Sequence, residues 1–254
     1  MDDTILLELA FDLAARAGET ILAVRARGFN TRLKADASPV TEADQQAELL
    51  IAAGLRAATP AVPVVAEEEM AAGHVPARAP GFWCVDPLDG TRGFAAGRDD
   101  FAVCIGLVRA GAPVLGVVGA PAKGVIYGGI VGHGAVKRTQ AGTVAIAARQ
   151  PPAEGLAVVA SRDHGKDART VPFLARRRVA SVVNIGSALK FCLLAEGLAD
   201  LYPRFGTTME WDTCGPQAVL EAAGGAVRLV ENDAVLRYGK PGWVNPHFYA
   251  TGRT

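Results

Sequence analysis

The amino-acid sequence predicts an α+β fold in which residues 1–150 form helices and a mostly antiparallel sheet, and residues 151–254 form a smaller α/β half. Three observations lead to this prediction. The chain has 254 residues, which is more than a typical single domain. Its 29 glycines and 15 prolines favour many short elements over a helical bundle. Helical patterns and then short apolar runs fill the first half, whereas strands and helices alternate after a proline-containing linker at 150–155.

Two helices are expected before the first sheet. Over 5–27, apolar residues recur at helical spacing with arginine and glutamate between them, and a second helix is expected over 39–58, where a Thr-Pro pair follows. Short apolar runs bounded by glycine, proline or acidic residues then predict strands. These strands are expected at 62–66, 82–85, 101–109, 113–119, 124–131 and 143–148.

The second half alternates between strand and helix. Apolar runs after the linker predict strands, and the stretches between them predict helices. The strands are expected at 156–160, 179–184, 199–203 and 226–230, and the helices near 167–177, near 187–196 and from about residue 212. This order is typical of a sheet with helices packed on it.

The charge balance excludes one class of function. Lysine plus arginine total 26 and aspartate plus glutamate total 26, so the formal net charge is zero. A protein that holds a nucleic-acid backbone by bulk charge is expected to be more basic. We therefore expect no nucleic-acid partner, and an anionic ligand must be bound by a few well-placed groups.

Composition also predicts the surroundings in which the protein works. The longest apolar stretch, 112–132, is interrupted by Lys123, two prolines and several glycines, so it fits two buried strands joined by a turn and no integral membrane segment is expected. The four cysteines show no C-x-x-C spacing, and we interpret them as reduced thiols in the core or near the site. The expected location is the cytoplasm, either free or peripheral on the inner membrane face.

Acidic residues at the ends of predicted strands are the most informative feature. Glu67 ends one strand, and Asp86 and Asp89 flank a tight turn after the next. Pro87 disfavours helix at Asp86, and Gly90 lets the backbone approach a ligand closely. Each segment alone is an ordinary turn or a solvated charge run, but their joint occurrence at strand ends favours a site. Several buried carboxylates without histidine or cysteine form a hard-oxygen site that suits Mg²⁺.

A fourth acid, Asp212, stands at the start of the last predicted helix. By itself it is most simply an N-cap, and Pro216 supports a helix start here. The N–H groups of a first helical turn would also favour a bound anion at this place. Both interpretations stay open at the level of the sequence.

In combination, these segments resemble the motifs of the lithium-sensitive, magnesium-dependent phosphatases of the inositol monophosphatase superfamily. The matching segments are Ser-Pro-Val-Thr-Glu-Ala-Asp at 38–44, Glu-Glu at 67–68, Asp-Pro-Leu-Asp-Gly-Thr at 86–91, Trp-Asp at 211–212 and Ala-Gly-Gly at 223–225. The resemblance covers essentially the whole chain and implies the family's layered αβαβα sandwich. It also implies two or three Mg²⁺ ions, bound by Glu67, Asp86, the Leu88 carbonyl, Asp89 and Asp212.

Within the superfamily, the second half is most similar to the bacterial CysQ-type 3′(2′),5′-bisphosphate nucleotidases. The likeness lies in 161–164, 185–192 and 201–206. The polar residues there also have ordinary interpretations, as a helix cap, a solvated lysine, one of many arginines or an incidental loop histidine. The resemblance alone makes four of them ligands of the phosphate that is not cleaved: His164, Ser187, Lys190 and Arg204.

Two positions depart from the family pattern. Arg92 stands where the family has lysine after Asp-Gly-Thr, and Cys214 stands where it has alanine after Trp-Asp-Thr. Neither change removes a ligand. Arg92 alters the edge of the pocket, and Cys214 is most simply a small packing residue.

The resemblance further implies how the site works. Magnesium would lower the pKa of a bound water, and Glu67 and the Thr91 hydroxyl would orient that water. The N–H groups of Gly90 and Thr91 would hold phosphate oxygens. Asp44 keeps two interpretations, a capping pair with Thr41 and a catalytic ligand of a weaker, additional metal. Besides the four ligands of the second phosphate, substrate contacts are implied for Glu67, Leu88, Asp89, Gly90, Thr91 and Asp212.

The leading hypothesis is a 3′(2′),5′-bisphosphate nucleotidase that converts adenosine 3′,5′-bisphosphate to AMP and phosphate, as in sulfur assimilation or nucleotide recycling. The alternative is an inositol-1-phosphate or sugar-phosphate phosphatase, which needs the metal acids but no second-phosphate ligands. A haloacid-dehalogenase type is disfavoured because its nucleophile lies in D-x-D, whereas Asp86 and Asp89 are three apart. A catalytically inactive nucleotide-binding scaffold is disfavoured because no motif acid is missing.

Overall fold

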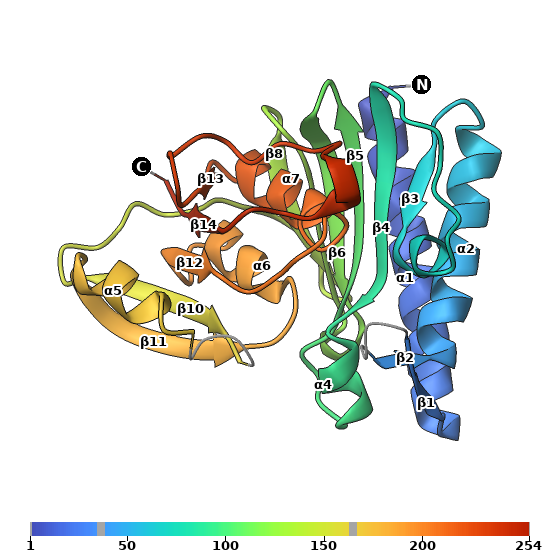
Figure 1. The fold of residues 1–254 in the computed structure, drawn as a ribbon, viewed down its shortest axis with the longest axis horizontal. Helices are drawn as coiled ribbons and strands as arrows, with labels where there is room; N and C mark the ends of the chain where they lie inside the picture. Colours follow the sequence, from blue (N-terminus) through green and yellow to red (C-terminus); the bar gives the residue numbers. More distant parts are fainter. Residues whose placement is uncertain (1, 35–38, 163–166, 254) are drawn as a thin grey trace.

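The computed structural model describes residues 2–34, 39–162 and 167–253, and its elements stack in five layers (Figure 1). A pair of long helices forms the first layer and a seven-stranded sheet the second. Two further helices lie between this sheet and a five-stranded sheet, and a short helix covers the far side. The layers alternate as α, β, α, β and α, which confirms the predicted sandwich.

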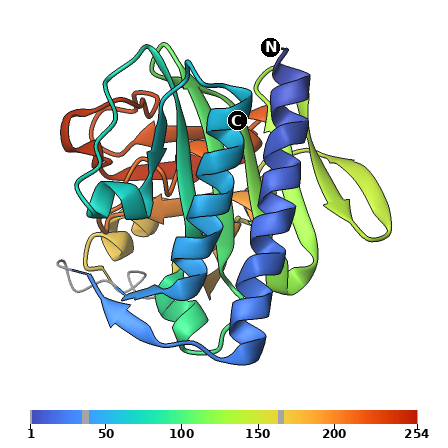
Figure 2. The same ribbon diagram turned by 90° about the vertical axis from the view of Figure 1, so that its right-hand side faces the viewer.

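The first layer consists of α1 (Asp3–Arg27) and α2 (Glu42–Ala58), which run side by side over one face of the seven-stranded sheet (Figure 2). α1 buries an apolar stripe that includes Leu6, Leu13 and Ile21. Residues three or four apart, or multiples of these, share one face of a helix, so the pattern in the sequence becomes the face that packs on the sheet.

The seven-stranded sheet has the order β3-β4-β5-β6-β7-β8-β9. β3 runs parallel to β4, with Ala66 opposite Val85, and the other neighbouring pairs are antiparallel. Because β3 and β4 are parallel, the residues that follow them emerge at the same edge of the sheet. The strands are β3 (Val64–Ala66), β4 (Gly81–Asp89), β5 (Ala102–Arg109), β6 (Ala112–Ala120), β7 (Val125–Ile130), β8 (Gly134–Thr139) and β9 (Gly142–Ile146).

The third layer, α6 (Leu189–Ala195) and α7 (Cys214–Ala222), packs against both sheets. α7 approaches the larger sheet through glycine, since a Cβ atom on Gly116 would lie 2.3 Å from the carbonyl oxygen of Gly215. A side chain at this position would separate the two backbones, so the close contact requires glycine.

The five-stranded sheet has the order β11-β10-β12-β14-β13. On its outer side, Phe173 of α5 packs against Phe205 and Tyr249. The elements of this half are β10 (Leu156–Ser161), α5 (Thr170–Ala175), β11 (Val179–Ile185), β12 (Leu201–Arg204), β13 (Ala226–Leu229), η2 (Pro241–Trp243) and β14 (Phe248–Thr251). The remaining short elements are β1 (Thr31–Leu33), β2 (Pro39–Thr41), α3 (Glu67–Ala71), α4 (Thr91–Ala95) and η1 (Pro121–Lys123).

Several element boundaries differ from the prediction. The helix expected from residue 39 begins at Glu42, because Pro39–Thr41 pairs with β1 as a strand. The helix expected from about 212 begins at Cys214. The strands β8 and β14 were not expected. In β8 the sequence shows no apolar run, and antiparallel pairing with β7 fixes this strand instead.

Two further expectations concern the chain as a whole. All four cysteines are free and buried, as expected for thiols of the core. Across the described segments, no helix combines the length and the apolar character needed to span a bilayer. The division into halves at residue 150 stays a prediction.

Candidate functional site

A cavity of about 680 Å³ opens where the ends of β3 and β4 meet the turn before α6 and the segment before α7. Acidic and basic side chains both line it, so it suits a phosphate held together with metal cations. The acids are Glu67, Asp86, Asp89, Asp100 and Asp212, and the bases are Lys34, Arg92, Arg98, Arg162, Lys190 and Arg204.

Glu67 and Asp86 lie together because the parallel strands β3 and β4 end at the same edge. Glu67 directly follows Ala66, whose partner across the strands is Val85, and the Glu67 carboxyl is hydrogen-bonded to that of Asp86. Asp86 also accepts a hydrogen bond from the N–H of Leu88 at 3.0 Å, which forms the predicted tight turn. Burial raises the pKa of Asp86 well above its usual range, and the charges of nearby carboxylates raise it further.

Asp89 and Asp212 complete the acidic group. Asp89 accepts a hydrogen bond from the N–H of Ala188, and Asp212 accepts one from the N–H of Met209 at 3.0 Å. The N-cap interpretation of Asp212 is therefore wrong, since its carboxylate bonds backward to a preceding turn and Thr213 is the cap residue of α7. Burial raises the pKa of both acids, and their mutual repulsion raises that of Asp212 further.

This donor set fits Mg²⁺ in its chemistry. Three carboxylates, buried Asp86 and half-buried Asp89 and Asp212, have pKa values raised by desolvation and repulsion, so a nearby cation would stabilise them as anions. Carboxylate oxygens, with the carbonyl of Leu88, are the ligands that Mg²⁺ prefers. In the described residues, however, no three histidine, cysteine, aspartate or glutamate side chains converge as closely as one metal ion requires.

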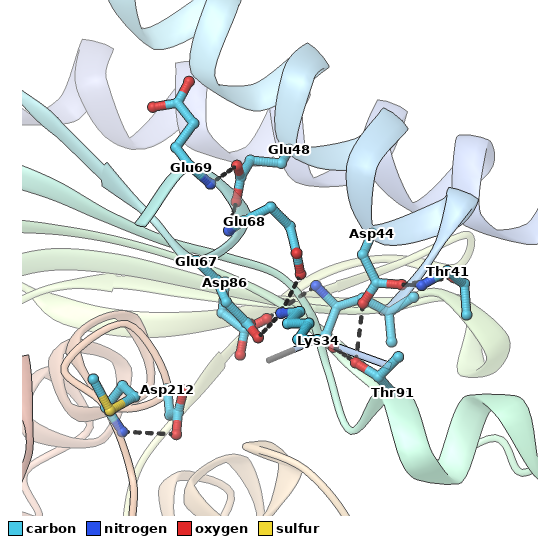
Figure 3. A network of polar contacts seen from close by, with 12 residues as sticks. Lys34, Thr41, Asp44, Glu48, Glu67, Glu68, Glu69, Asp86, Thr91 and Asp212 are labelled. Carbon is cyan, nitrogen blue, oxygen red and sulfur yellow. Dashed lines mark hydrogen bonds and ion pairs between the residues drawn. The ribbon is translucent and has the colours of Figure 1, made fainter. Parts of the chain in front are cut away.

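A lysine that the sequence did not single out lies among these acids. Nζ of Lys34 lies 2.7 Å from Oε1 of Glu67 and 2.6 Å from Oε1 of Glu68 (Figure 3). Burial favours its neutral form, but the two glutamates raise the pKa of Lys34 well above its usual range. An ammonium ion thus binds Glu67, and a metal ion would have to share that carboxylate with it or displace it.

Asp44 forms the capping pair that was one of its two interpretations, and it also contacts the site. It forms a capping box with Thr41 at the start of α2, and its other carboxylate oxygen lies 3.0 Å from Oγ1 of Thr91. That hydroxyl is also 3.0 Å from the carbonyl oxygen of Leu88, so its one proton can go to either acceptor. Burial raises the pKa of Asp44. Its catalytic role stays a prediction.

Glu48 holds the backbone of the segment that follows Glu67, and the sequence analysis did not predict it. This carboxylate of α2 accepts hydrogen bonds from the N–H groups of Glu68 and Glu69, at 2.6 and 2.8 Å (Figure 3). Burial raises its pKa to about 7. Because Glu67 precedes these two residues, Glu48 fixes the position of the Glu67 backbone. A glutamate at a buried helix position is the only signal that the sequence offers.

The structure brings Ser187, Lys190 and Arg204 to the same cavity as the acids. Ser187 has a φ of +54°, a left-handed conformation that is rare outside glycine. Lys190 is buried and donates to the carbonyl oxygens of Ser187 and, at 3.3 Å, Ile185. Burial lowers the pKa of Lys190 to about 8, and the charge of Asp89 opposes this shift. The fourth predicted ligand, His164, lies outside the described residues.

Comparison with known proteins agrees with this geometry. The inositol monophosphatase family model matches residues 2–249. The 3′(2′),5′-bisphosphate nucleotidase CysQ of Salmonella typhimurium is 39% identical over 251 residues, covering 97% of this chain and 99% of that protein. The Escherichia coli K12 protein of the same name is 38% identical over 248 residues, covering 96% and 98%.

Solved structures give the same result. CysQ from Bacteroides thetaiotaomicron, a bacterial member of the inositol monophosphatase family, superposes with a TM-score of 0.81 at 32% identity, covering 98% of this chain and 97% of that one. An inositol monophosphatase from Zymomonas mobilis superposes with a TM-score of 0.80 at 26% identity, covering 100% and 94%. With a family model over nearly its whole length and relatives well above 30% identity, this chain belongs to the inositol monophosphatase family.

Proposed function

We propose that this protein is a magnesium-dependent phosphatase that removes the 3′-phosphate of adenosine 3′,5′-bisphosphate and leaves AMP and inorganic phosphate. One observation carries the proposal: the metal-type acids and the cations expected to hold a second phosphate line a single cavity. The relatives named CysQ are bisphosphate nucleotidases by name and match over nearly their full length, which supports the same substrate here. We also propose a cytoplasmic location, where reducing conditions keep buried thiols free.

The chain's own residues would divide the work in the following way. Glu67, Asp86, Asp89, Asp212 and the carbonyl of Leu88 would hold two Mg²⁺ ions, and Asp44 would hold a third. Magnesium would supply Lewis-acid chemistry at the phosphate that is cleaved.

The turn after β4 would bind that phosphate and orient the attacking water. Gly90 has a φ of +95°, which lets its N–H and that of Thr91 approach a phosphate oxygen. The Thr91 hydroxyl, held by Asp44, would orient the water together with Glu67. Beside this turn, Ser187 and Lys190 would hold the phosphate that remains on the product.

Phosphate release across a substrate panel tests the proposal. We expect activity that requires Mg²⁺, is abolished by a chelator, and is higher on adenosine 3′,5′-bisphosphate than on inositol 1-phosphate or fructose 1,6-bisphosphate. The expected preference is at least about tenfold in kcat/KM, since a charge-assisted hydrogen bond contributes about 1.5–3 kcal/mol. A preference for inositol 1-phosphate would contradict the nucleotide substrate and favour an inositol phosphate instead. Turnover that continues in the presence of the chelator would contradict the role of Mg²⁺.

A further inference from the structure

Asp100 and Arg162 form an ion pair at the cavity, which the predicted site does not include. Nη2 of Arg162 lies 2.7 Å from Oδ2 of Asp100, and Nη1 lies 3.3 Å from Oδ1. Asp100 precedes β5 and exposes 9% of its side chain, whereas Arg162 follows β10 and exposes 37%. Both residues line the cavity. The buried carboxylate therefore orients an accessible guanidinium toward the ligand space.

The same carboxylate holds the turn that carries Ser187. Oδ2 of Asp100 accepts a hydrogen bond from the N–H of Gly186 at 2.6 Å, and a Cβ atom on Gly186 would lie 2.6 Å from that oxygen. A Cβ atom on Gly90 would lie 3.3 Å from Cβ of Ser187 and 3.2 Å from the carbonyl oxygen of Asp100. Asp100, the ion-pair partner of Arg162, therefore lies beside the turn of the cleaved phosphate and beside the turn proposed to bind the second one.

The charges around Arg162 fit an anionic ligand. Asp100 raises the pKa of Lys190 and Arg162 lowers it, so both lie within electrostatic range of this proposed phosphate ligand. A guanidinium carries five N–H donors, and the ion pair with Asp100 uses two of them. A planar, oriented guanidinium matches two phosphate oxygens at once, which a lysine ammonium cannot do.

We propose that Arg162, oriented by Asp100, contacts the phosphate that is not cleaved and sets the preference for doubly phosphorylated nucleotides. This inference rests on the proposed function and adds a specificity residue and its positioning residue to it. It differs from a purely structural role, in which the ion pair would only join the loop before β5 to the end of β10.

Steady-state kinetics of Arg162→Ala separate the two roles. With Mg²⁺ present, we expect kcat/KM on adenosine 3′,5′-bisphosphate to fall by about ten- to hundredfold, mainly through KM, because a contact remote from the reacting bond is lost. On 3′-AMP, which lacks the second phosphate, the change should stay below about threefold. Arg176→Ala is the matched control, since Arg176 is an exposed arginine of the same half that does not line the cavity.

Binding of the product provides a readout without turnover. AMP retains the 5′-phosphate and adenosine lacks it, so calorimetry with both ligands isolates that group. Arg162→Ala should weaken the binding of AMP by about tenfold or more and leave the binding of adenosine unchanged. Arg162→Lys should restore only part of the lost affinity for AMP. Equal affinity of AMP for the variant and the unaltered protein would overturn the inference.

Asp100→Asn tests the positioning role. Asparagine can still accept from Gly186 N–H but no longer pairs with the charge of Arg162, so a smaller loss confined to the bisphosphate is expected, again in KM. Equal losses of kcat/KM on the bisphosphate and on 3′-AMP in either variant would mean that the pair only stabilises the fold. That result would refute this inference and leave the proposed function standing. If the unaltered protein hydrolysed no nucleotide with Mg²⁺ present, the proposed function would fail first and the inference with it.

Discussion

Lys34 places an ammonium group between two glutamates, one of which is a proposed metal ligand. Both members of the pair with Glu67 are largely buried, with 10% and 23% of their side chains exposed. Charges interact more strongly in such surroundings than in water. Lys34 therefore neutralises Glu67 when no metal is bound and repels a metal ion that approaches it.

Replacement of Lys34 by methionine should strengthen Mg²⁺ binding. We expect the half-saturating Mg²⁺ concentration to fall by at least about threefold, because a like charge beside the ion is removed. The metal-free protein should also melt at a lower temperature, since Glu67 and Glu68 lose their counter-ion. Both effects can be followed by Mg²⁺ titration of tryptophan fluorescence and of thermal unfolding, with Lys123→Met as an exposed control. Weaker binding in Lys34→Met would mean that the lysine helps to orient Glu67 for the metal.

Asp89 leads to a prediction in which activity and stability move in opposite directions. Asp89→Asn should reduce turnover by at least about 100-fold, because one charged oxygen ligand is lost. The same change should stabilise the metal-free protein, since burial raises the pKa of Asp89 and a neutral amide avoids the buried charge. The amide oxygen can still accept from Ala188. Near-normal turnover, or a loss of stability measured by urea unfolding without metal, would contradict this account of Asp89.

At the scale of elements, apolar runs predicted β5, β6 and β7 to within one or two residues, because strands covered by helices on both faces are apolar throughout. Local motifs singled out the acids and also Ser187, Lys190 and Arg204, which line one cavity. Lys34, Glu48 and the pair of Asp100 with Arg162 were not, because their partners lie 20 to 62 residues away along the chain. Only the fold brings such residues together, so no local pattern marks them.

The contact of α7 with the larger sheet leads to a prediction about stability. Gly116→Ala should destabilise the protein by about 1–3 kcal/mol, because the added methyl group would lie 2.3 Å from the carbonyl oxygen of Gly215. Gly119→Ala on the same strand is the control, since its methyl group would meet only ordinary contacts at 3.6 Å or more. The free energy of unfolding in urea measures both. Equal stability of the two variants would show that α7 can shift away from the sheet without cost.

At the scale of the whole molecule, Asp200 joins the segment after the first sheet to the second sheet. This aspartate accepts two hydrogen bonds from Arg149, at 2.8 and 2.9 Å, and one from the N–H of Ala157 at 2.8 Å. Burial alone would raise the pKa of Asp200, but these hydrogen bonds outweigh it, so the pKa lies below the usual 3.8.

Acid should therefore weaken this connection. A carboxyl whose pKa is lowered by folding contributes stability above the pKa of the unfolded chain, near 3.8, and loses it as the pH falls through the lower folded value. Asp200→Asn should cost about 1–3 kcal/mol at pH 7, and the gap to the unaltered protein should narrow below pH 3.8. Urea unfolding from pH 7 to 2.5 measures this. Asp99→Asn is the control: it breaks an exposed ion pair with Arg25 and should cost at most about 1 kcal/mol. If the stability difference between Asp200→Asn and the unaltered protein does not change with pH, the effect of Asp200 comes from packing and not from its charge.

The backbone contact between Gly116 and Gly215 has a consequence for which substitutions this chain can accept. Side chains elsewhere in the interior act as spacers, and an exchange of leucine for valine changes the gap between layers by a fraction of an ångström. No spacer separates α7 from the sheet at this contact, so such exchanges elsewhere leave the local separation unchanged. Asp212 is three residues from Gly215, so the contact of Gly215 with β6 holds the chain close to this acid. We therefore expect exchanges of core side chains away from this contact to leave the backbone beside Asp212 in place.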